Sequence, residues 1–490
     1  MTNQTNIASI LQLRLLPKWL VGRSIAFFFV AMLACWVVFG YVPGMDLILA
    51  ASISVVLFFG AGQVMANKWL YNSERLFLRN VFIAGLVLRV IWVLYMYFIF
   101  NPKHYGNTYG DTADVDWFMS FAKGLAEWLT LSSQYSLVQL INDVYVSAID
   151  DVGYPMWLAV EYLLTGGLSD VFIPMMVKCV VGAYCAKCIY RVAKRHFGEG
   201  TARIAAIFVC LNPNMIYWCA SMMKEAEMVF VCCMAVDKLD EALSSGQKIT
   251  FRALLPGLLL GLYLFFMRTA LGLALFLGVI AHLVFASRRV ISIGKKVIAG
   301  MLVAITLFVG VGDRIFTQSK GYIEDIQSGY QEKNMEWRTQ RSGGNELAKY
   351  AGAAVFAPLI FTIPFPTFNA AEASQLLQIQ LAGGSYIKNI LSYFVIMVLI
   401  IMLLTKKWRD HVFILAYTCA YLGVLVFSSF AQSGRFHMPI WPMLMLLAAY
   451  GIQCVRQNKL MRNMYIYVLL AEVVVCLAWN WFKLAGRGML

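Results

Sequence analysis

Long apolar segments, separated by short polar stretches, run along most of this chain. Two of the first segments extend from about Ser24 to Tyr41 and from Val81 to Phe100, with another apolar segment between them. A helix of about twenty apolar residues is long enough to cross the hydrocarbon core of a membrane. The pattern therefore predicts an all-α polytopic membrane protein with about thirteen transmembrane helices.

Three weaker segments predict helices that do not cross the membrane. Tyr154–Leu168 and Ala351–Phe365 are apolar but short, and glycine or proline interrupts them, which favours re-entrant or surface-lying helices. After Gly110, large apolar side chains recur at helical spacing and predict an amphipathic helix at the membrane interface. These side chains are Trp117, Phe118, Phe121, Leu125 and Trp128.

The same pattern divides the chain into four parts. We expect an N-terminal transmembrane hairpin at 1–80 and a transmembrane core at 81–312, which includes an outer loop at 101–170. A second outer loop with a short apolar helix follows at 313–388, and the C-terminal transmembrane helices occupy 389–490.

Composition and charge support a membrane protein and argue against a nucleic-acid-binding protein. The chain is 61% hydrophobic and only 13% charged, whereas about a quarter of the residues of a soluble domain are charged. The net charge of +14 is spread over short clusters between apolar segments instead of forming one basic patch. The lipid bilayer is therefore an expected partner, and nucleic acid is not.

The distribution of basic residues predicts the orientation, because lysine and arginine accumulate in cytoplasmic loops. Arg14, Lys18 and Arg23 precede the first apolar segment, which places the N-terminus in the cytoplasm. The loop at 101–170 contains nine acidic and only two basic residues, so it belongs outside. We expect an integral protein of a bacterial inner (plasma) membrane that works at its extracytoplasmic face.

Three carboxylates at the start of this outer loop are the first candidates for chemistry. They are Asp111, Asp114 and Asp116, in the stretch "YGDTADVDWF". If the helix begins near Asp111, then Asp111, Asp114, Phe118 and Ala122 share one face, and Asp116 points elsewhere. Acids in a first turn also cap a helix and favour its dipole. A carboxylate beside lipid can instead act as a general base, and both interpretations stay open.

Four motifs in order resemble the GT-C superfamily of integral-membrane glycosyltransferases. Asp114, Phe118 and Ala122 have the family's spacing of an acid, an aromatic and a small residue. "GYPMWLAVEYLLTGGL" matches its Tyr-Pro element, and "CIYRVAKRHFGEGTARIAAIFVCLNPNMIYW" matches its span that ends in a basic cluster. "SGRFHMPIWPMLMLLAAYGI" matches its late Arg-aromatic element with spaced prolines.

The resemblance implies transfer of a sugar from a polyprenyl-phosphate donor to a glycan, lipid or protein acceptor. It implies that Asp114 is the catalytic base, with Asp111 as the second choice or as a partner that tunes it. Asp116 then holds the loop or binds an acceptor hydroxyl. We expect no cofactor, although the three aspartates carry oxygen ligands that a divalent metal could use.

Further polar residues lie at predicted outer turns. Lys224 and Glu225 are a candidate substrate-binding pair, or a mutually neutralised pair at a helix start. Arg268 suits a lipid-phosphate leaving group, or it extends to the headgroups. Arg435 and His437 are a second candidate phosphate contact, in which Arg435 ranks above His437.

Two alternative functions share parts of this pattern. A polysaccharide polymerase or ligase acts on lipid-linked glycans at the same face, but such enzymes normally carry a late outer loop rich in Arg and His. The loop at 313–385 has Arg and no His. A lipid-linked oligosaccharide flippase needs charges along a path through the membrane. Here Lys178 and Lys187 are the clearest ionisable residues within spans, which favours an enzyme.

Overall fold

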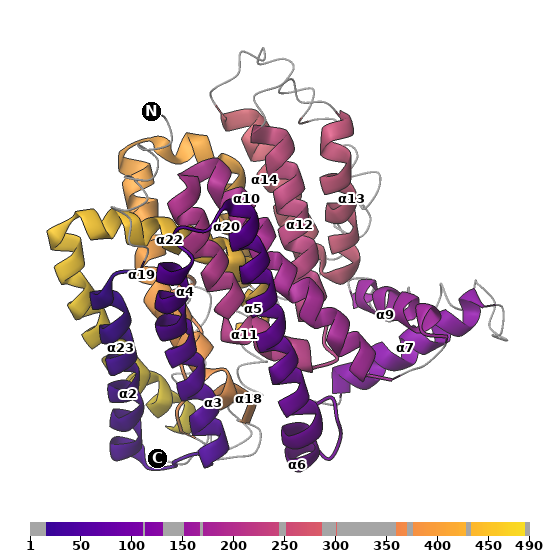
Figure 1. The fold of residues 1–490 in the computed structure, drawn as a ribbon, viewed down its shortest axis with the longest axis horizontal. Coiled ribbons are helices and arrows are strands. Elements are labelled where there is room, and N and C mark those ends of the chain that lie inside the picture. Colours follow the sequence, from indigo (N-terminus) through magenta and orange to yellow (C-terminus); the bar gives the residue numbers. More distant parts are fainter. Residues whose placement is uncertain are drawn as a thin grey trace.

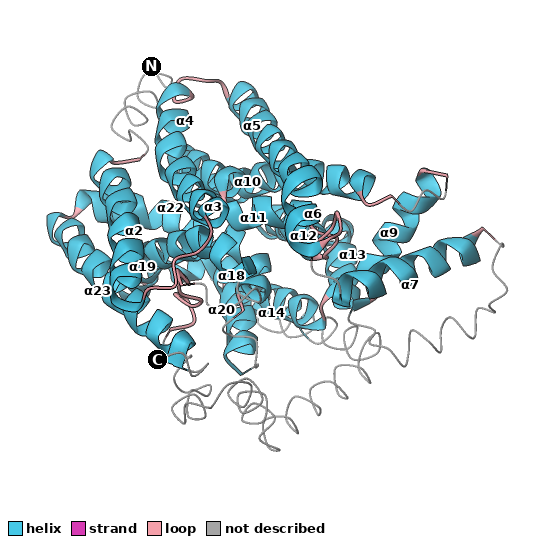
Figure 2. Ribbon diagram, turned by 90° about the horizontal axis from the view of Figure 1, so that it is seen from below, coloured by secondary structure: helices cyan, strands magenta, loops and turns pink. Residues whose placement is uncertain are grey.

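The computed structural model is a bundle of helices with a smaller helical arm at one side (Figure 1). It describes residues 16–110, 113–130, 151–166, 170–244, 251–286, 300, 359–369, 376–427 and 433–485. Every element in these ranges is a helix, and Figure 2 shows helices and loops alone. The prediction of an all-α protein is confirmed for this part of the chain.

The first half of the described chain contains the N-terminal helices, the arm and a long hairpin. The elements are α2 (Lys18–Phe39), α3 (Met45–Val56), η1 (Leu57–Ala61), α4 (Gly62–Lys68), α5 (Glu74–Tyr95), η2 (Met96–Phe100), α6 (Asn101–Tyr105), α7 (Ala113–Leu129), α9 (Gly153–Leu164), α10 (Phe172–Leu211), α11 (Pro213–Tyr217) and η4 (Trp218–Ala220).

The second half completes the bundle. Its elements are α12 (Glu225–Ser244), α13 (Phe251–Met267), α14 (Thr269–Phe285), α18 (Leu376–Gln380), α19 (Ala382–Leu404), η7 (Lys407–His411), α20 (Val412–Phe427), α21 (Gly434–His437), η8 (Met438–Ile440), α22 (Trp441–Gln457) and α23 (Lys459–Ala485).

Eight of the described helices are long and apolar enough to cross a membrane. The predicted span Val81–Phe100 lies inside one of them, a continuous helical segment from Glu74 to Tyr105. Two further apolar helices, α13 and α14, are shorter. The structure therefore supports an integral membrane protein, and the count of about thirteen spans stays a prediction.

A glycine turns α10 back on itself. Gly198 has φ +82° and ψ 178°, a conformation that side-chain-bearing residues rarely adopt, and the helical segments before and after it form a hairpin. Ala183 and Cys210 consequently lie beside the same point of α5: a Cβ on Gly85 would meet both within 3.6 Å. The basic cluster that ends the predicted span thus surrounds the hairpin turn.

Charged residues of α10 and α12 form a network at this end of the bundle, here called the basic end. Arg191 and Arg195 contact Asp237 at 2.6 and 2.8 Å, and Arg195 also donates to Asp240 at 2.6 Å. His196 Nε2 lies 2.6 Å from the other Asp240 oxygen. Because α12 begins at Glu225, fifteen residues before Asp240, the helix start lies roughly 22 Å away at the opposite end.

The predicted helices of the outer loop are present as α7 and α9. Phe118 of α7 packs edge-on against Tyr154 of α9, with ring centroids 5.1 Å apart. Figure 1 shows the two helices side by side, projecting from the bundle. The amphipathic face of α7 is therefore partly covered by α9.

The predicted short helix at Ala351–Phe365 is not found in the part that the structure describes, which begins at residue 359. Residues 359–369 form a turn followed by irregular chain. Pro364 and Pro366 lack a backbone donor and disfavour a helix. The Asn480 side chain of α23 provides hydrogen-bond partners for the backbone of this segment. It donates to Pro366 O at 3.1 Å and accepts from Phe368 N at 2.8 Å.

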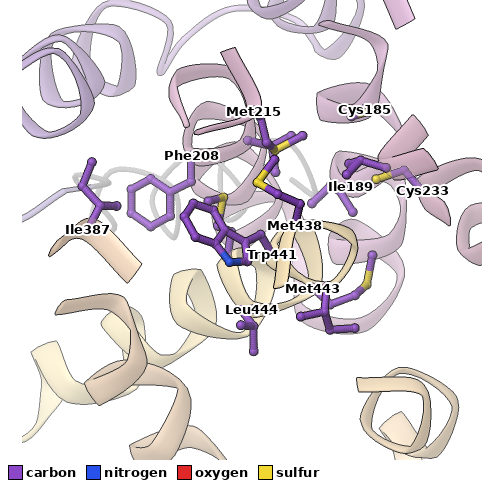
Figure 3. Packing of buried hydrophobic residues seen from close by; sticks show 14 of the residues in the cluster. Cys185, Ile189, Phe208, Met215, Cys233, Ile387, Met438, Trp441, Met443 and Leu444 are labelled. Carbon is purple, nitrogen blue, oxygen red and sulfur yellow. The ribbon is translucent and has the colours of Figure 1, made fainter. Parts of the chain in front are cut away.

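The bundle centre is filled by large apolar side chains from several helices. Trp441 of α22 is 1% exposed, and Figure 3 shows it among side chains of α10, α11, α19 and η8. Those labelled around it include Phe208, Met215, Ile387 and Met438. This packing connects the early and late segments of the chain.

Arg89 of α5 is a buried cation in this interior, with 0% of its surface exposed. It donates to the carbonyl oxygens of Gly85, Val209 and Cys210 at 3.0 to 3.4 Å. The last two belong to the final turn of α10, where helix carbonyls lack internal partners and the dipole favours a cation. Arg89 therefore caps the end of the α10 hairpin, and Gly182 gives its side chain room, because a Cβ there would lie 2.9 Å from Nε.

We expect Arg89→Met to destabilise the folded protein by about 2 kcal/mol, because it strands two buried carbonyls. The change should lower the melting temperature in detergent. Arg79→Met is the matched control, since Arg79 is exposed on the same helix. Equal melting temperatures for the two variants would contradict the capping role.

Candidate active site

Four predicted site residues from distant segments meet at the end of the bundle opposite the basic end. Asp114 lies in the first turn of α7 and Glu225 begins α12. Arg268 joins α13 to α14, and Arg435 lies in the short helix α21. Together these four residues are here called the ion cluster.

Arg435 connects two carboxylates within the ion cluster. Its Nη1 donates to Asp114 Oδ2 at 2.8 Å, and its Nε donates to Glu225 Oε1. The guanidinium fork presents several donors in one plane, so a single Arg can bind two acceptors. Arg435 thus brings α7 and α12 together at the same point.

Exposure differs sharply along this bridge. The Asp114 side chain is 58% exposed, that of Arg435 is 21% exposed, and that of Glu225 is fully buried. The buried carboxylate requires cationic neighbours, because an isolated charge in the interior is costly. The cluster therefore has a buried anchor, Glu225, and an accessible carboxylate, Asp114.

Arg268 adds a second cation beside the buried carboxylate. Its Nη2 lies 4.0 Å from Glu225 Oε1, and its Nη1 donates to the Tyr421 hydroxyl at 3.2 Å. Tyr421 in turn donates to Phe436 O at 2.8 Å, and the Arg268 guanidinium lies 4.3 Å from the centroid of the Phe436 ring. Arg268 is thus held in place next to Arg435 rather than extended to lipid headgroups.

Lys224 fixes the turn that precedes Glu225. Its Nζ donates to Met267 O at 2.8 Å and pairs with the carboxylate of Asp151, just before α9. Met267 is the residue before Arg268, so this lysine joins the turns that carry Glu225 and Arg268. Lys224 pairs directly with Asp151, and its charge also acts on Glu225, its partner in the predicted alternative.

Asp116 and His437 contact groups outside the ion cluster, and Asp111 lies outside the described residues. Asp116 is exposed and accepts a hydrogen bond from the Tyr109 hydroxyl at 3.2 Å. Burial and the Asp116 charge raise the pKa of Tyr109. His437 is buried, with Nδ1 2.8 Å from Lys388 Nζ of α19.

A second buried polar group lies next to the cluster, and sequence reasoning assigned it no role. Lys178 of α10 pairs with Glu227 of α12 at 3.0 Å, and both side chains are fully buried. Glu161 of α9 also lies close enough to Glu227 for the two charges to interact. In the sequence, Lys178 and Glu227 are visible as ionisable residues within or beside apolar segments, which is unusual. The sequence does not show that they pair with each other.

Within the described residues, no group of three or more His, Cys, Asp or Glu side chains has a geometry that could hold a metal ion. Asp114 and Asp116 are described, and Asp111 is not.

The profile of the Alg9-like mannosyltransferase family matches residues 128–322. This is less than half of the chain; it includes Glu225 and Arg268 but neither Asp114 nor Arg435. The match confirms the resemblance to membrane glycosyltransferases of the GT-C type and indicates that the protein is a glycosyltransferase. No curated protein and no solved structure matches the chain.

Glu161 is a buried carboxyl close to the site whose charge depends on pH. Its Oε1 accepts a hydrogen bond from Trp157 Nε1 at 2.6 Å, and Oε2 has no hydrogen-bond partner in the described part of the chain. Burial first, and then the Glu227 charge, raise the pKa of Glu161 from its ordinary value of 4.5 to about 7. The folded protein therefore holds a proton that the unfolded chain releases at lower pH.

We expect this carboxyl to make stability fall as pH rises. Because the folded pKa is raised, the stability from keeping the proton is present below pH 4.5 and is lost as pH rises to about 7. Glu161→Gln stays neutral, so it should match wild type near about pH 4 and melt several degrees higher near about pH 8. Parallel melting curves for the two proteins at both pH values would contradict the assignment.

Proposed function

We propose that the protein transfers a sugar from a polyprenyl-phosphate donor to an acceptor hydroxyl at the extracytoplasmic face. The observation that carries this proposal is the ion cluster, in which the exposed Asp114 pairs with the Arg435 guanidinium, and the buried Glu225 connects Arg435 to a second guanidinium, that of Arg268. A carboxylate suits a proton-accepting role, and guanidinium groups suit a phosphate. The acceptor is a glycan, lipid or protein, and mannose is the first donor sugar to test because of the family match.

In this mechanism Asp114 takes the proton of the acceptor hydroxyl as its oxygen attacks the anomeric carbon. A new carbon–oxygen bond forms, and the bond between the anomeric carbon and the phosphate oxygen breaks. The electron pair stays on the lipid phosphate, whose charge Arg268 and Arg435 stabilise. The proton then passes from Asp114 to water, since its side chain is 58% exposed.

The orientation in this proposal rests on the separation of charge between the two ends of the bundle. Arg191 and Arg195 at the basic end belong to a cluster predicted to face the cytoplasm. The ion cluster lies at the opposite end, beside the acidic loop that begins near Asp114. We propose on this basis that the site faces outward across a bacterial inner membrane.

The alternative functions predict different arrangements of charge. A flippase needs exposed charged groups along a path, yet Lys178 is fully buried in an ion pair and Lys187 lies against the rings of Phe82 and Tyr184. A polymerase or ligase also uses a lipid-linked donor, so the products of a transfer assay separate it from a monosaccharide transferase.

We expect Asp114→Asn to lower sugar transfer by about 10²–10⁴-fold, because the amide cannot accept the proton. Transfer is measured in membranes with a panel of polyprenyl-phosphate sugars, beginning with mannose, with and without a chelator since the proposal involves no cofactor. Glu127→Gln, an exposed acid on the same helix, is the control. Asp111→Asn is measured in parallel, and a greater loss there would transfer the role of base to Asp111.

We expect Arg435→Lys to raise the donor KM by about tenfold while the protein stays folded, because an ammonium lacks the planar fork. Arg435→Met should lose more transfer than Arg435→Lys, since it removes the charge as well. Unchanged donor KM values in both variants would show that Arg435 does not bind the donor phosphate.

A further inference from the structure

Lys178 is buried in α10 next to the ion cluster, and it contacts three separate elements. Its Nζ donates to Glu227 Oε2 on α12 at 3.0 Å and to Met223 O at 2.5 Å. It also lies 4.6 Å from the centroid of the Tyr154 ring on α9. Both members of the Lys178–Glu227 pair have fully buried side chains.

Burial makes this pair an inefficient way to stabilise a fold. Removing two charges from water costs several kcal/mol per ion, and the attraction between them only offsets that cost when the geometry is good. Apolar side chains of similar volume are often equally stable in such positions. The geometry of the pair therefore calls for an explanation other than net stability.

The three contacts of Lys178 lead to both carboxylates of the ion cluster. Met223 lies in the turn before Glu225, and Glu227 lies two residues after it on α12. Tyr154 packs against Phe118 of α7, one helical turn after Asp114. Lys178 thus links the helix that carries the accessible carboxylate to the helix that carries the buried one.

Apolar packing alone would leave the distance between α7 and α12 adjustable. The edge-on contact between Phe118 and Tyr154 is a packing contact without a polar direction. The hydrogen bonds from Lys178 are directional, and an unpaired charge at this depth would be costly. Sliding the start of α12 would break these hydrogen bonds, and sliding α9 would move the Tyr154 ring away from the Lys178 ammonium, so the contacts resist small displacements of the site.

We propose that the Lys178–Glu227 pair is a positioning device that keeps Asp114 in register with Glu225, Arg268 and Arg435 for the transfer reaction. This inference rests on the function proposed above. Neither residue contacts the ion cluster through an ion pair, so their effect passes through the turn at Met223 and through Tyr154. A displacement of about 1 Å at a reacting group can cost about 10²-fold in rate.

The test removes both charges together. Lys178→Met/Glu227→Leu replaces a buried ion pair by apolar residues, which is often neutral for stability, whereas a single change leaves one buried charge. We expect the double variant to melt close to wild type, with kcat lowered about 10–100-fold and the donor KM nearly unchanged. A purely structural role would move the melting temperature and the amount of folded protein instead of kcat.

Lys238→Met/Glu241→Leu is the matched control. It makes the same substitutions in an exposed ion pair of α12, the helix that also carries Glu227. The paired Lys238 and Glu241 atoms lie 2.9 Å apart, near the basic end. We expect it to keep both the melting temperature and kcat of wild type. An equal fall of kcat in both double variants would overturn the positioning role.

Three further outcomes decide between this inference and the function on which it rests. A folded Lys178→Met/Glu227→Leu variant with wild-type kcat, beside an inactive Asp114→Asn, overturns the positioning role alone. If Asp114→Asn and Asp111→Asn both keep full transfer, or wild type transfers no sugar, the proposed function fails and the inference fails with it. If the double variant does not fold, Lys178→Arg decides: the altered length of the pair should lower kcat several-fold at unchanged donor KM, and a wild-type kcat overturns the proposal.

Discussion

The Arg435 guanidinium holds together two carboxylates that lie far apart in the sequence, and the arrangement of the site depends on it. Asp114 is 321 residues away and Glu225 is 210 residues away along the chain. Without this cation, the buried Glu225 would keep Arg268 at 4.0 Å as its nearest ion-pair partner in the described chain. The cost of a poorly paired carboxylate in the interior therefore draws α21, α12 and α7 to one place.

The same cost explains why charge is concentrated at two ends of the bundle. At the basic end, Asp237 and Asp240 are almost fully buried and pair with Arg191 and Arg195. Between the ends, the interior is packed with large apolar side chains around Trp441. Charged side chains in this interior have nearby polar partners, as Arg89 does in the helix carbonyl oxygens that it contacts. A site at one end can thus be polar while the span beneath it stays apolar.

Much of this fold was predictable, because the signals are local in the sequence. Apolar length predicted the long helices and the short helix α9, and helical spacing predicted α7. Charge alternation predicts that Asp114, Glu225, Arg268 and Arg435 share one side of the membrane, and the structure brings the four residues together at one end of the bundle. Their pairings were not predictable, since periodicity reports which side of a helix a residue occupies and says nothing about the distant helix that packs there.

The contacts of His437 and of the Lys178–Glu227 pair were not predicted from the sequence, for physical reasons. His437 is two positions after Arg435, and side chains two apart on a helical turn do not face the same way, so grouping them as one phosphate contact conflicts with helix geometry. The Lys178–Glu227 pair lies within apolar segments where each residue was visible and its partner was not. Only the α10 hairpin at Gly198, together with the packing of α12, brings them together.

Under the proposed mechanism, the ion pair between Asp114 and Arg435 also constrains the order of the catalytic steps. While Arg435 donates to Asp114, it occupies an oxygen that would otherwise accept the acceptor's proton. A donor phosphate competes for the same guanidinium and offers more negative charge. Its arrival draws Arg435 toward the leaving group and releases the carboxylate that must act as base. We therefore propose that donor binding precedes activation of the acceptor, and that the buried Glu225 keeps the guanidinium anchored while its outer partner changes.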